Sequence, residues 1–236
     1  AMTESPRVFS IWNAESWKKI KEIGFSLLEL RDNEFSHNDS LLAIADGAGG
    51  LFLYETQNWE LIKKIDNQDL PPAHPYYYWE DGVQHITNLS FSYNDRYIAF
   101  SGDRTFIYDI EKDEIVREIF GMAPKFSPVD NKIAVAKVKI DPGHLPKYYT
   151  YGIDYIDLDT GDSVYIDDGE PTGGILFSND GRHLIFRGKH AIIFDLDNLT
   201  EVQWSQNLSW VLDISHNNTY LIGKGNGFKL LRIDHI

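Results

Sequence analysis

The sequence predicts an all-β chain that folds as a β-propeller of four-stranded antiparallel blades, and three observations support this. An apolar residue, a Ser and a polar turn recur along the chain at intervals of tens of residues, as in propellers, solenoids and arrays. Each copy precedes short runs rich in β-branched and aromatic residues, bounded by Asn, Asp and Gly, which are strand and turn signals. No segment of helical length keeps a 3.6-residue apolar period. The copies lie at 35–39, 91–95, 126–130, 177–181 and, less closely matched, 214–218.

Four strands are assigned to each repeat unit. The repeated segment ends the first strand, and an apolar second strand follows its turn. The third strand is an apolar run that contains an acidic residue near its end, at 51–55, 106–109, 155–158 and 192–195. The fourth strand alternates apolar and polar residues, as an edge strand with one wet face does. It lies at 60–65, 114–119, 163–166 and 201–204.

This unit resembles the blade of WD40-type propellers. The resemblance rests on the four strands, on turns such as Ser92-Tyr93-Asn94-Asp95, and on aromatic-acid endings of the third strand such as those at 108–109 and 194–195. It covers nearly the whole chain and implies a ring of such blades. The Gly-His pair of that family is missing, and its Trp-Asp dipeptide is replaced by Tyr-Asp, Phe-Asp or Tyr-Glu. The hydrogen-bond network that those residues form in the family is therefore not expected here.

Residues 1–236 are predicted to form a single propeller domain. Segments 8–13 and 17–23 have the patterns of third and fourth strands, whereas 211–215, 220–223 and 228–233 have those of first, second and third strands. Joining the two ends would close a ring of five blades and cover exposed strand edges. The 21 strands counted in this way exceed the 20 of five complete blades. Six blades, or a part of a larger ring, are the alternatives.

Composition excludes several classes of function. Acidic residues outnumber basic ones by 36 to 22, giving a net charge of −14, which argues against nucleic acid or an anionic membrane as the main partner. Without cysteine there is no disulfide, thiolate metal site or Cys nucleophile, and we expect a cytoplasmic location. The chain shows no signal-peptide pattern and no apolar run of about 20 residues.

Two insertions break the spacing of the repeats and form the predicted binding surface. Successive copies lie 35 or 37 residues apart, except for intervals of 56 and 51 residues that contain the insertions 66–85 and 139–152. The first joins a fourth strand to a first strand and the second joins a second strand to a third, and in an up-and-down blade these connections share one face. Both combine Pro, His and several Tyr, and Tyr and Trp dominate binding hot spots. The predicted binding residues are His74, Tyr76, Tyr77, Tyr78, Trp79, His144, Tyr148, Tyr149 and Tyr151. The alternative is that these aromatics only seal the central channel as a lid.

A second candidate surface is acidic. Between Lys147 and Arg182 there is no Lys or Arg. A basic protein partner is one interpretation of this stretch, and a solvated blade edge that discourages strand pairing is the other. Its residues are Asp154, Asp157, Asp159, Asp162, Asp167, Asp168 and Glu170.

Catalytic signatures are weak. Five-bladed glycoside hydrolases resemble the predicted outline, but the loose carboxylate candidates are only Glu29, Asp32, Glu34 and Glu170. His74, His85 and His144 lack the spacing of a metal site, and segment 157–162 is too short for a calcium loop. No catalytic residue, metal or cofactor is predicted. The sequence favours a non-catalytic protein-binding scaffold or adaptor that uses one loop face. The alternatives are a glycan- or small-molecule-processing enzyme, and an acidic neutralising partner of a basic protein such as a toxin.

Overall fold

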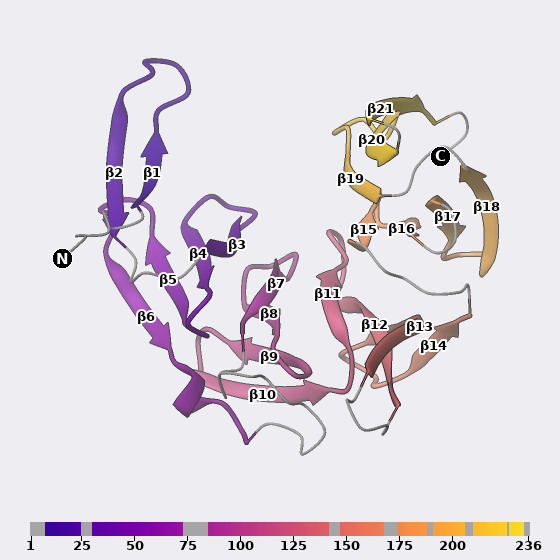
Figure 1. Cartoon of the computed structure of the whole chain (residues 1–236), viewed down its shortest axis with the longest axis horizontal. Helices are drawn as coiled ribbons and strands as arrows, with labels where there is room; N and C mark the ends of the chain where they lie inside the picture. Colours follow the sequence, from indigo (N-terminus) through magenta and orange to yellow (C-terminus); the bar gives the residue numbers. More distant parts are fainter. Residues whose placement is uncertain are drawn as a thin grey trace.

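The blades follow one another along an arc around a common centre, which is the predicted all-β propeller arrangement (Figure 1). This computed structural model describes residues 8–24, 30–72, 85–141, 147–167, 174–187, 191–205, 210–225 and 227–233. In these ranges the chain forms 21 strands and one 3-10 helix, η1 (Asn67–Asp69). Every strand pair is antiparallel, and sheet order follows sequence order in each blade.

The first four blades are complete four-stranded sheets. Blade 1 contains β3 (Leu30–Phe35), β4 (Leu41–Asp46), β5 (Leu51–Glu55) and β6 (Leu61–Ile65). Blade 2 contains β7 (Thr87–Phe91), β8 (Tyr97–Ser101), β9 (Thr105–Asp109) and β10 (Glu114–Ile119). Blade 3 contains β11 (Met122–Phe126), β12 (Lys132–Asp141), β13 (Lys147–Asp157) and β14 (Ser163–Ile166). Blade 4 contains β15 (Leu176–Phe177), β16 (His183–Arg187), β17 (Ala191–Asp195) and β18 (Thr200–Ser205).

The two ends of the chain form separate sheets, which corrects the predicted closure. Blade 5 is the three-stranded sheet of β19 (Trp210–Ile214), β20 (Tyr220–Gly225) and β21 (Gly227–Arg232). The N-terminal hairpin pairs β1 (Val8–Trp12) with β2 (Lys19–Gly24). Within the described ranges no hydrogen-bonded pair joins this hairpin to blade 5, and an opening separates them (Figure 1). Closure would require β21 to pair with β2 as the third strand of one blade. β1 also has the third-strand pattern, and it already pairs with β2.

A hydrogen-bonded Ser explains why the same short segment recurs in successive repeat units. The Ser36 hydroxyl donates to Asn38 Oδ1 (3.0 Å) and accepts from the Leu41 amide (2.9 Å). Ser92, Ser178 and Ser215 accept from the backbone amide five residues on in the same way. The fourth turn residue has positive φ at Asp39, Asp95, Gly181 and Asn218. Asn, Asp and Gly tolerate that conformation best, so the motif specifies a tight turn between first and second strands.

Apolar side chains between consecutive blades form the core. We call the side of a blade that meets the next blade its leading face, and the other side its trailing face. Leu51 and Leu53 on the leading face of blade 1 pack with Phe91 and Phe100 of blade 2. Ala191 and Ile193 hold the equivalent positions in blade 4 and pack against Leu221 of blade 5. Similar clusters join the hairpin to blade 1, blade 2 to blade 3 and blade 3 to blade 4.

Replacing the buried serine should destabilise the fold more than replacing its exposed neighbour. We expect Ser36→Ala to cost about 1–3 kcal/mol of unfolding free energy, because the Leu41 amide and Asn38 lose their partner. Ser40→Ala, four residues away on the exposed side of the same turn, should change it by less than about 0.5 kcal/mol. Urea titration of both variants measures the difference. Equal effects would contradict the structural role given to the motif.

Truncating the side chain at one repeat position should destabilise the protein strongly in blade 4 and hardly at all in blade 5. Ile193 is 4% exposed, whereas Leu230, at the equivalent third-strand position of blade 5, is 66% exposed. Ile193→Ala should therefore cost about 2–5 kcal/mol, as for a buried aliphatic side chain. Leu230→Ala should cost less than about 0.5 kcal/mol. A large loss of thermal stability in Leu230→Ala would show that this face is covered in solution.

Candidate binding face

The two described ends of insertion 66–85 make contacts on the face where second strands turn into third strands. Arg104, in the turn between β8 and β9, donates from Nη2 to the Pro72 carbonyl oxygen at 2.8 Å. His85 Nδ1 lies 2.7 Å from the carbonyl oxygen of Gly47, in the turn between β4 and β5. We call this side of the arc the loop face. Both connections that the sequence singled out therefore emerge on it.

Arg104 is held in place by more than this contact. Its guanidinium also donates to Asp103 Oδ2 (2.9 Å) and to Glu118 Oε2 (2.7 Å) on the outer strand β10. The side chain is 18% exposed, so these are partly desolvated, charge-assisted bonds. Arg104 thus ties the start of the connection to two elements of blade 2.

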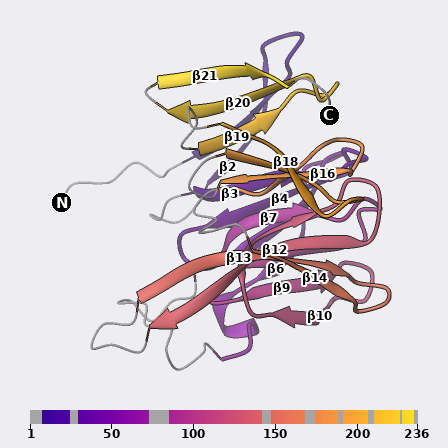
Figure 2. The ribbon, with the colours of Figure 1, turned by 90° about the vertical axis from the view of Figure 1, so that its right-hand side faces the viewer.

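The second insertion is mostly paired strand rather than loop. β12 and β13 pair over nine positions, from Lys132↔Asp157 to Asp141↔Lys147, with one bulge between Ala136 and Val138. The last four pairs extend this hairpin beyond the other blades, and Figure 2 shows it projecting from the arc. The expected loop 139–152 is therefore corrected to a short connection at the tip of a protruding β-hairpin.

Of the predicted binding residues, only Tyr151 has a described side chain. His74, Tyr76, Tyr77, Tyr78, Trp79 and His144 lie outside the described residues, and for Tyr148 and Tyr149 only the strand pairing is described. Tyr151 is 39% exposed at the base of the hairpin, with its ring centroid 6.3 Å from that of Tyr165. The Tyr165 hydroxyl donates to the Tyr151 carbonyl oxygen at 2.8 Å. A Cβ at Gly152 would lie 2.6 Å from the Tyr165 ring, so Gly is needed for this contact.

A lysine completes this small patch. Lys137 Nζ lies 3.1 Å from Asp154 Oδ2 and 5.1 Å from the centroid of the Tyr165 ring, within cation–π range. Burial raises the pKa of Tyr165, and the nearby Asp167 raises it further. The patch therefore presents two tyrosine rings beside one ion pair, and Tyr is enriched at protein interfaces.

The predicted acidic surface is divided between two sides of blade 3. Asp154 and Asp167 lie near the Tyr151 patch. Asp157, Asp159 and Asp162 lie in or beside the turn that joins β13 to β14, at the opposite end of the blade. Asp157 accepts from the amides of Asp159 (2.9 Å) and Thr160 (3.0 Å), and these bonds lower its pKa. Asp168 and Glu170 lie outside the described residues.

The central channel contains an ion pair between first strands. Lys125 Nζ of β11 lies 2.6 Å from Glu34 Oε1 of β3. Asp32 accepts from the amides of Leu89 (2.7 Å) and Asn33 (2.8 Å). Cavities of about 220 and 210 Å³ lie beside this pair. Two of the carboxylates considered for glycan chemistry thus connect blades, and the other two, Glu29 and Glu170, lie outside the described residues.

Glu34 should make stability depend on pH. Burial raises the pKa of Glu34, and Lys125 offsets only part of this. Glu34 therefore binds its proton more tightly in the folded protein than in the unfolded chain. Its contribution to stability is present below about pH 4.3 and is lost as the pH rises through the folded pKa. We expect the Tm of the native protein minus that of Glu34→Gln to decrease between about pH 4 and pH 7. A difference that increases with pH would contradict this sign.

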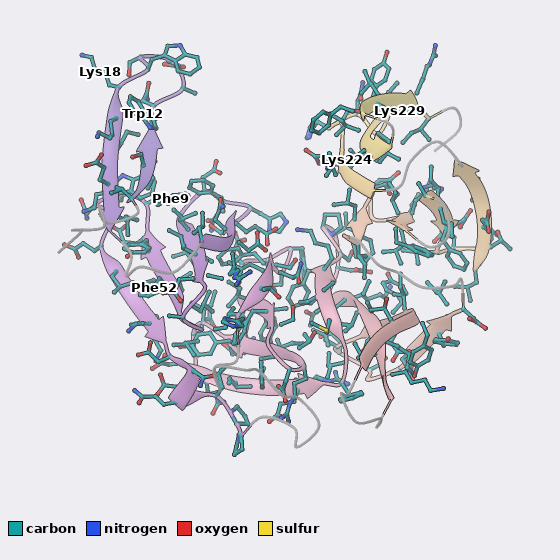
Figure 3. All side chains as sticks on the ribbon, in the orientation of Figure 1. Phe9, Trp12, Lys18, Phe52, Lys224 and Lys229 are labelled. Atoms are coloured by element: carbon teal, nitrogen blue, oxygen red, sulfur yellow. The ribbon has the colours of Figure 1, made fainter. Side chains whose placement is uncertain are left out.

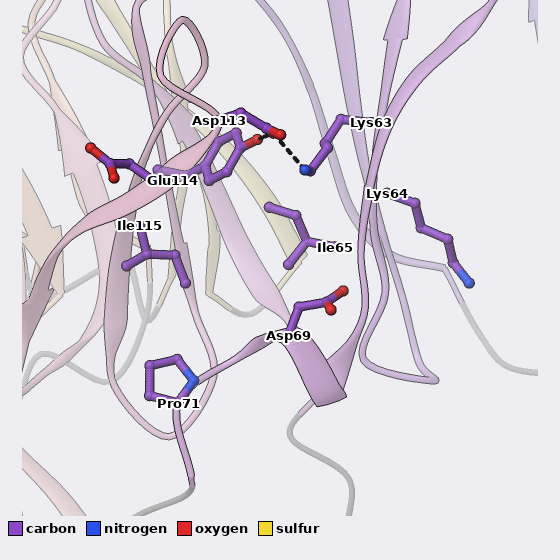
Figure 4. A pocket seen from close by; sticks show the side chains of 9 residues that line it. Lys63, Lys64, Ile65, Asp69, Pro71, Asp113, Glu114 and Ile115 are labelled. Atoms are coloured by element: carbon purple, nitrogen blue, oxygen red, sulfur yellow. Dashed lines mark hydrogen bonds and ion pairs between the residues drawn. The ribbon is translucent and has the colours of Figure 1, made fainter.

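A polar cleft between blades 1 and 2 was not visible in the sequence. It has a volume of about 510 Å³ and lies between β6 and β10, with Asp69 and Pro71 at one end (Figure 4). At the other end Lys63 Nζ lies 2.5 Å from Asp113 Oδ1, and the Tyr108 hydroxyl also donates to Asp113. Both contacts lower the pKa of Asp113. Because Lys63 and Asp113 belong to different blades, only the packing of the blades brings them together.

Metal and membrane sites do not emerge from the described ranges. Within them, no three His, Asp or Glu side chains come close enough to hold a metal ion. The described part of the chain also contains no helix long and apolar enough to cross a membrane.

Comparisons with known proteins support the fold alone. No family model matches the chain, and no curated protein sequence matches it. Among solved structures, the chain is similar to the β-propeller domain of Cps50 (Swd1) from Myceliophteria thermophila. The TM-score is 0.63 at 13% sequence identity, and the match covers 88% of this chain and 69% of that one.

Proposed function

We propose that this chain is a non-catalytic protein-binding scaffold whose loop face carries the binding surface. The observation that carries the proposal is the β12–β13 hairpin, which extends by four strand pairs on the loop face. Arg104 and His85 hold the two ends of the other insertion on the same face. Rigid scaffolds typically present their binding residues on such connections. The similarity to the propeller domain of Cps50 (Swd1) is compatible with a scaffold.

The aromatic residues supply the binding energy in this proposal. Tyr and Trp bury large areas at low cost in side-chain entropy, and Tyr151 with Tyr165 shows one such pair already exposed at the base of the hairpin. The remaining members are Tyr76, Tyr77, Tyr78, Trp79, Tyr148 and Tyr149. The polar cleft beside Pro71 adjoins the start of insertion 66–85 and would hold polar side chains of the same partner.

Partner capture from the native host, followed by mass spectrometry and affinity measurement, tests this function. Trp79→Ala with Tyr149→Ala should weaken binding of the captured protein by about 2 kcal/mol or more, the level expected of a hot spot. The melting temperature should barely change. A control pair, Ile62→Ala with Val202→Ala, removes half-exposed apolar side chains from outer strands and should leave binding intact. If the aromatic pair instead lowers the melting temperature and spares binding, these residues are a lid.

A basic partner is a second version of the same proposal. The net charge of −14 and the exposed Asp167 favour it, because surface charge steers oppositely charged proteins. Reversing charge at Asp167 and Asp168 should then slow association, and salt should weaken binding. Binding that is insensitive to both would restrict the function to the aromatic residues.

A further inference from the structure

A cleft between blades 2 and 3 contains a positive charge without a partner. In Figure 3, side chains of consecutive blades meet in the spaces between their sheets, and this cleft of about 380 Å³ lies in one such space. Arg117 of β10 lines it and is partly buried, yet its guanidinium makes no ion pair or hydrogen bond with the part of the chain that the structure describes. The partly buried Arg96 and Arg104 each bond a carboxylate, at 2.8 and 2.9 Å.

The neighbouring cleft, between blades 1 and 2, shows which group Arg117 lacks. Lys63 of β6 pairs with Leu53 in the middle of β5. Arg117 pairs with Ile107 in the middle of β9, so it holds the same repeat position one blade later. Lys63 Nζ lies 2.5 Å from Asp113 Oδ1 of the following blade. By the repeat, an acidic residue in the same turn of blade 3 would pair with Arg117.

Gly161 holds that position in blade 3. The amides of Asp113 and Gly161 each donate, at 2.9 Å, to the carbonyl oxygen four residues earlier. Both residues also have positive φ, 60° and 82°. A Cβ added at Gly161 would meet no heavy atom within 4 Å. The repeat therefore omits the carboxylate that would neutralise Arg117 and leaves open space in its place.

The opposite wall of the cleft carries an acidic group and an apolar one. Asp159, in the turn between β13 and β14, lines this wall, and Asn131 Nδ2 donates to its Oδ1 at 2.6 Å. The Leu158 amide donates to the Asn131 carbonyl oxygen at 2.9 Å, which joins the two turns of blade 3. Arg117 and Asp159 line the same cleft but form no ion pair with each other. Opposite charges held apart in one cleft are complementary to a ligand that carries both charges.

We propose that this cleft binds a small zwitterion, namely an amino acid with an apolar side chain. The ligand carboxylate takes the place that Asp113 has in the neighbouring cleft and forms charge-assisted hydrogen bonds with Arg117. Its ammonium donates to Asp159, and its side chain lies against Val116 and Leu158. The volume of the cleft is in the range of small-molecule sites. The cleft adjoins the β13–β14 turn, at the end of the blade opposite the loop face, so this site is independent of the scaffold function.

A probe and two analogues test the chemistry of the ligand. L-leucine carries both charges, 4-methylpentanoate has the same skeleton without the ammonium, and 3-methylbutylamine has it without the carboxylate. Each is titrated into the full chain and followed by calorimetry. We expect saturable one-to-one binding of L-leucine, binding of 4-methylpentanoate that is about tenfold weaker, and no saturable binding of 3-methylbutylamine.

Substitutions locate the site. Arg117→Gln should weaken L-leucine binding by about tenfold or more, whereas Arg31→Gln, which removes an exposed arginine of β3, should leave it unchanged. Gly161→Asp supplies the carboxylate that the repeat omits, so it should pair with Arg117 and also weaken binding by about tenfold or more. Gly161→Asn is the matched control, because Asn has the same size, tolerates positive φ and carries no charge. It should keep the affinity within about threefold. Melting curves of all four variants check that they fold.

Four results would overturn the proposal. The first is no saturable binding of L-leucine up to about 10 mM. The second is binding that neither Arg117→Gln nor Gly161→Asp weakens. The third is binding of 3-methylbutylamine as tight as that of L-leucine, which would leave Arg117 without a role. The fourth is an equal loss in Gly161→Asn and Gly161→Asp, which would show that bulk at this position, rather than charge, blocks the cleft.

Discussion

The packing of one blade's leading face against the next blade's trailing face is the interaction on which the rest of the structure depends. Each sheet is only four strands wide or narrower, so its apolar faces must be covered by neighbours. Leu51 and Leu53 are buried in this way by blade 2, and Ile193 by blade 5. The Glu34–Lys125 pair joins different blades, and the contact from Arg104 to Pro72 joins blade 2 to the connection that follows blade 1, so both require blades already placed by that packing.

Much of the fold could be predicted because the repeat encodes local chemistry. The Ser hydroxyl and the Asn, Asp or Gly three residues later specify one turn, and that turn can be recognised in a linear sequence. The predicted closure failed for a reason that strand patterns also contain. Both β1 and β21 have the third-strand pattern, and one blade has room for only one of them.

The binding surface could be predicted only in part. Loop composition pointed to insertions 66–85 and 139–152, but not to the contact from Arg104 to Pro72 across 32 residues, which holds the start of the first insertion on the loop face. The second insertion looked like a loop because Pro142, Gly143 and Pro146 interrupt it, yet the residues on either side continue the strand pairing. The Lys63–Asp113 cleft depends on the angle between adjacent blades, which sequence patterns do not encode.

The open arc has a consequence for how the molecule loses structure. Inner blades are clamped between two neighbours, whereas the N-terminal hairpin and blade 5 each have one among the described elements. In such quasi-one-dimensional arrays, stability is close to a sum of unit and nearest-neighbour terms, so the ends fray first. We therefore expect local unfolding to begin at the N-terminal hairpin and at blade 5 and to proceed inward, so that blades 2 and 3 unfold last.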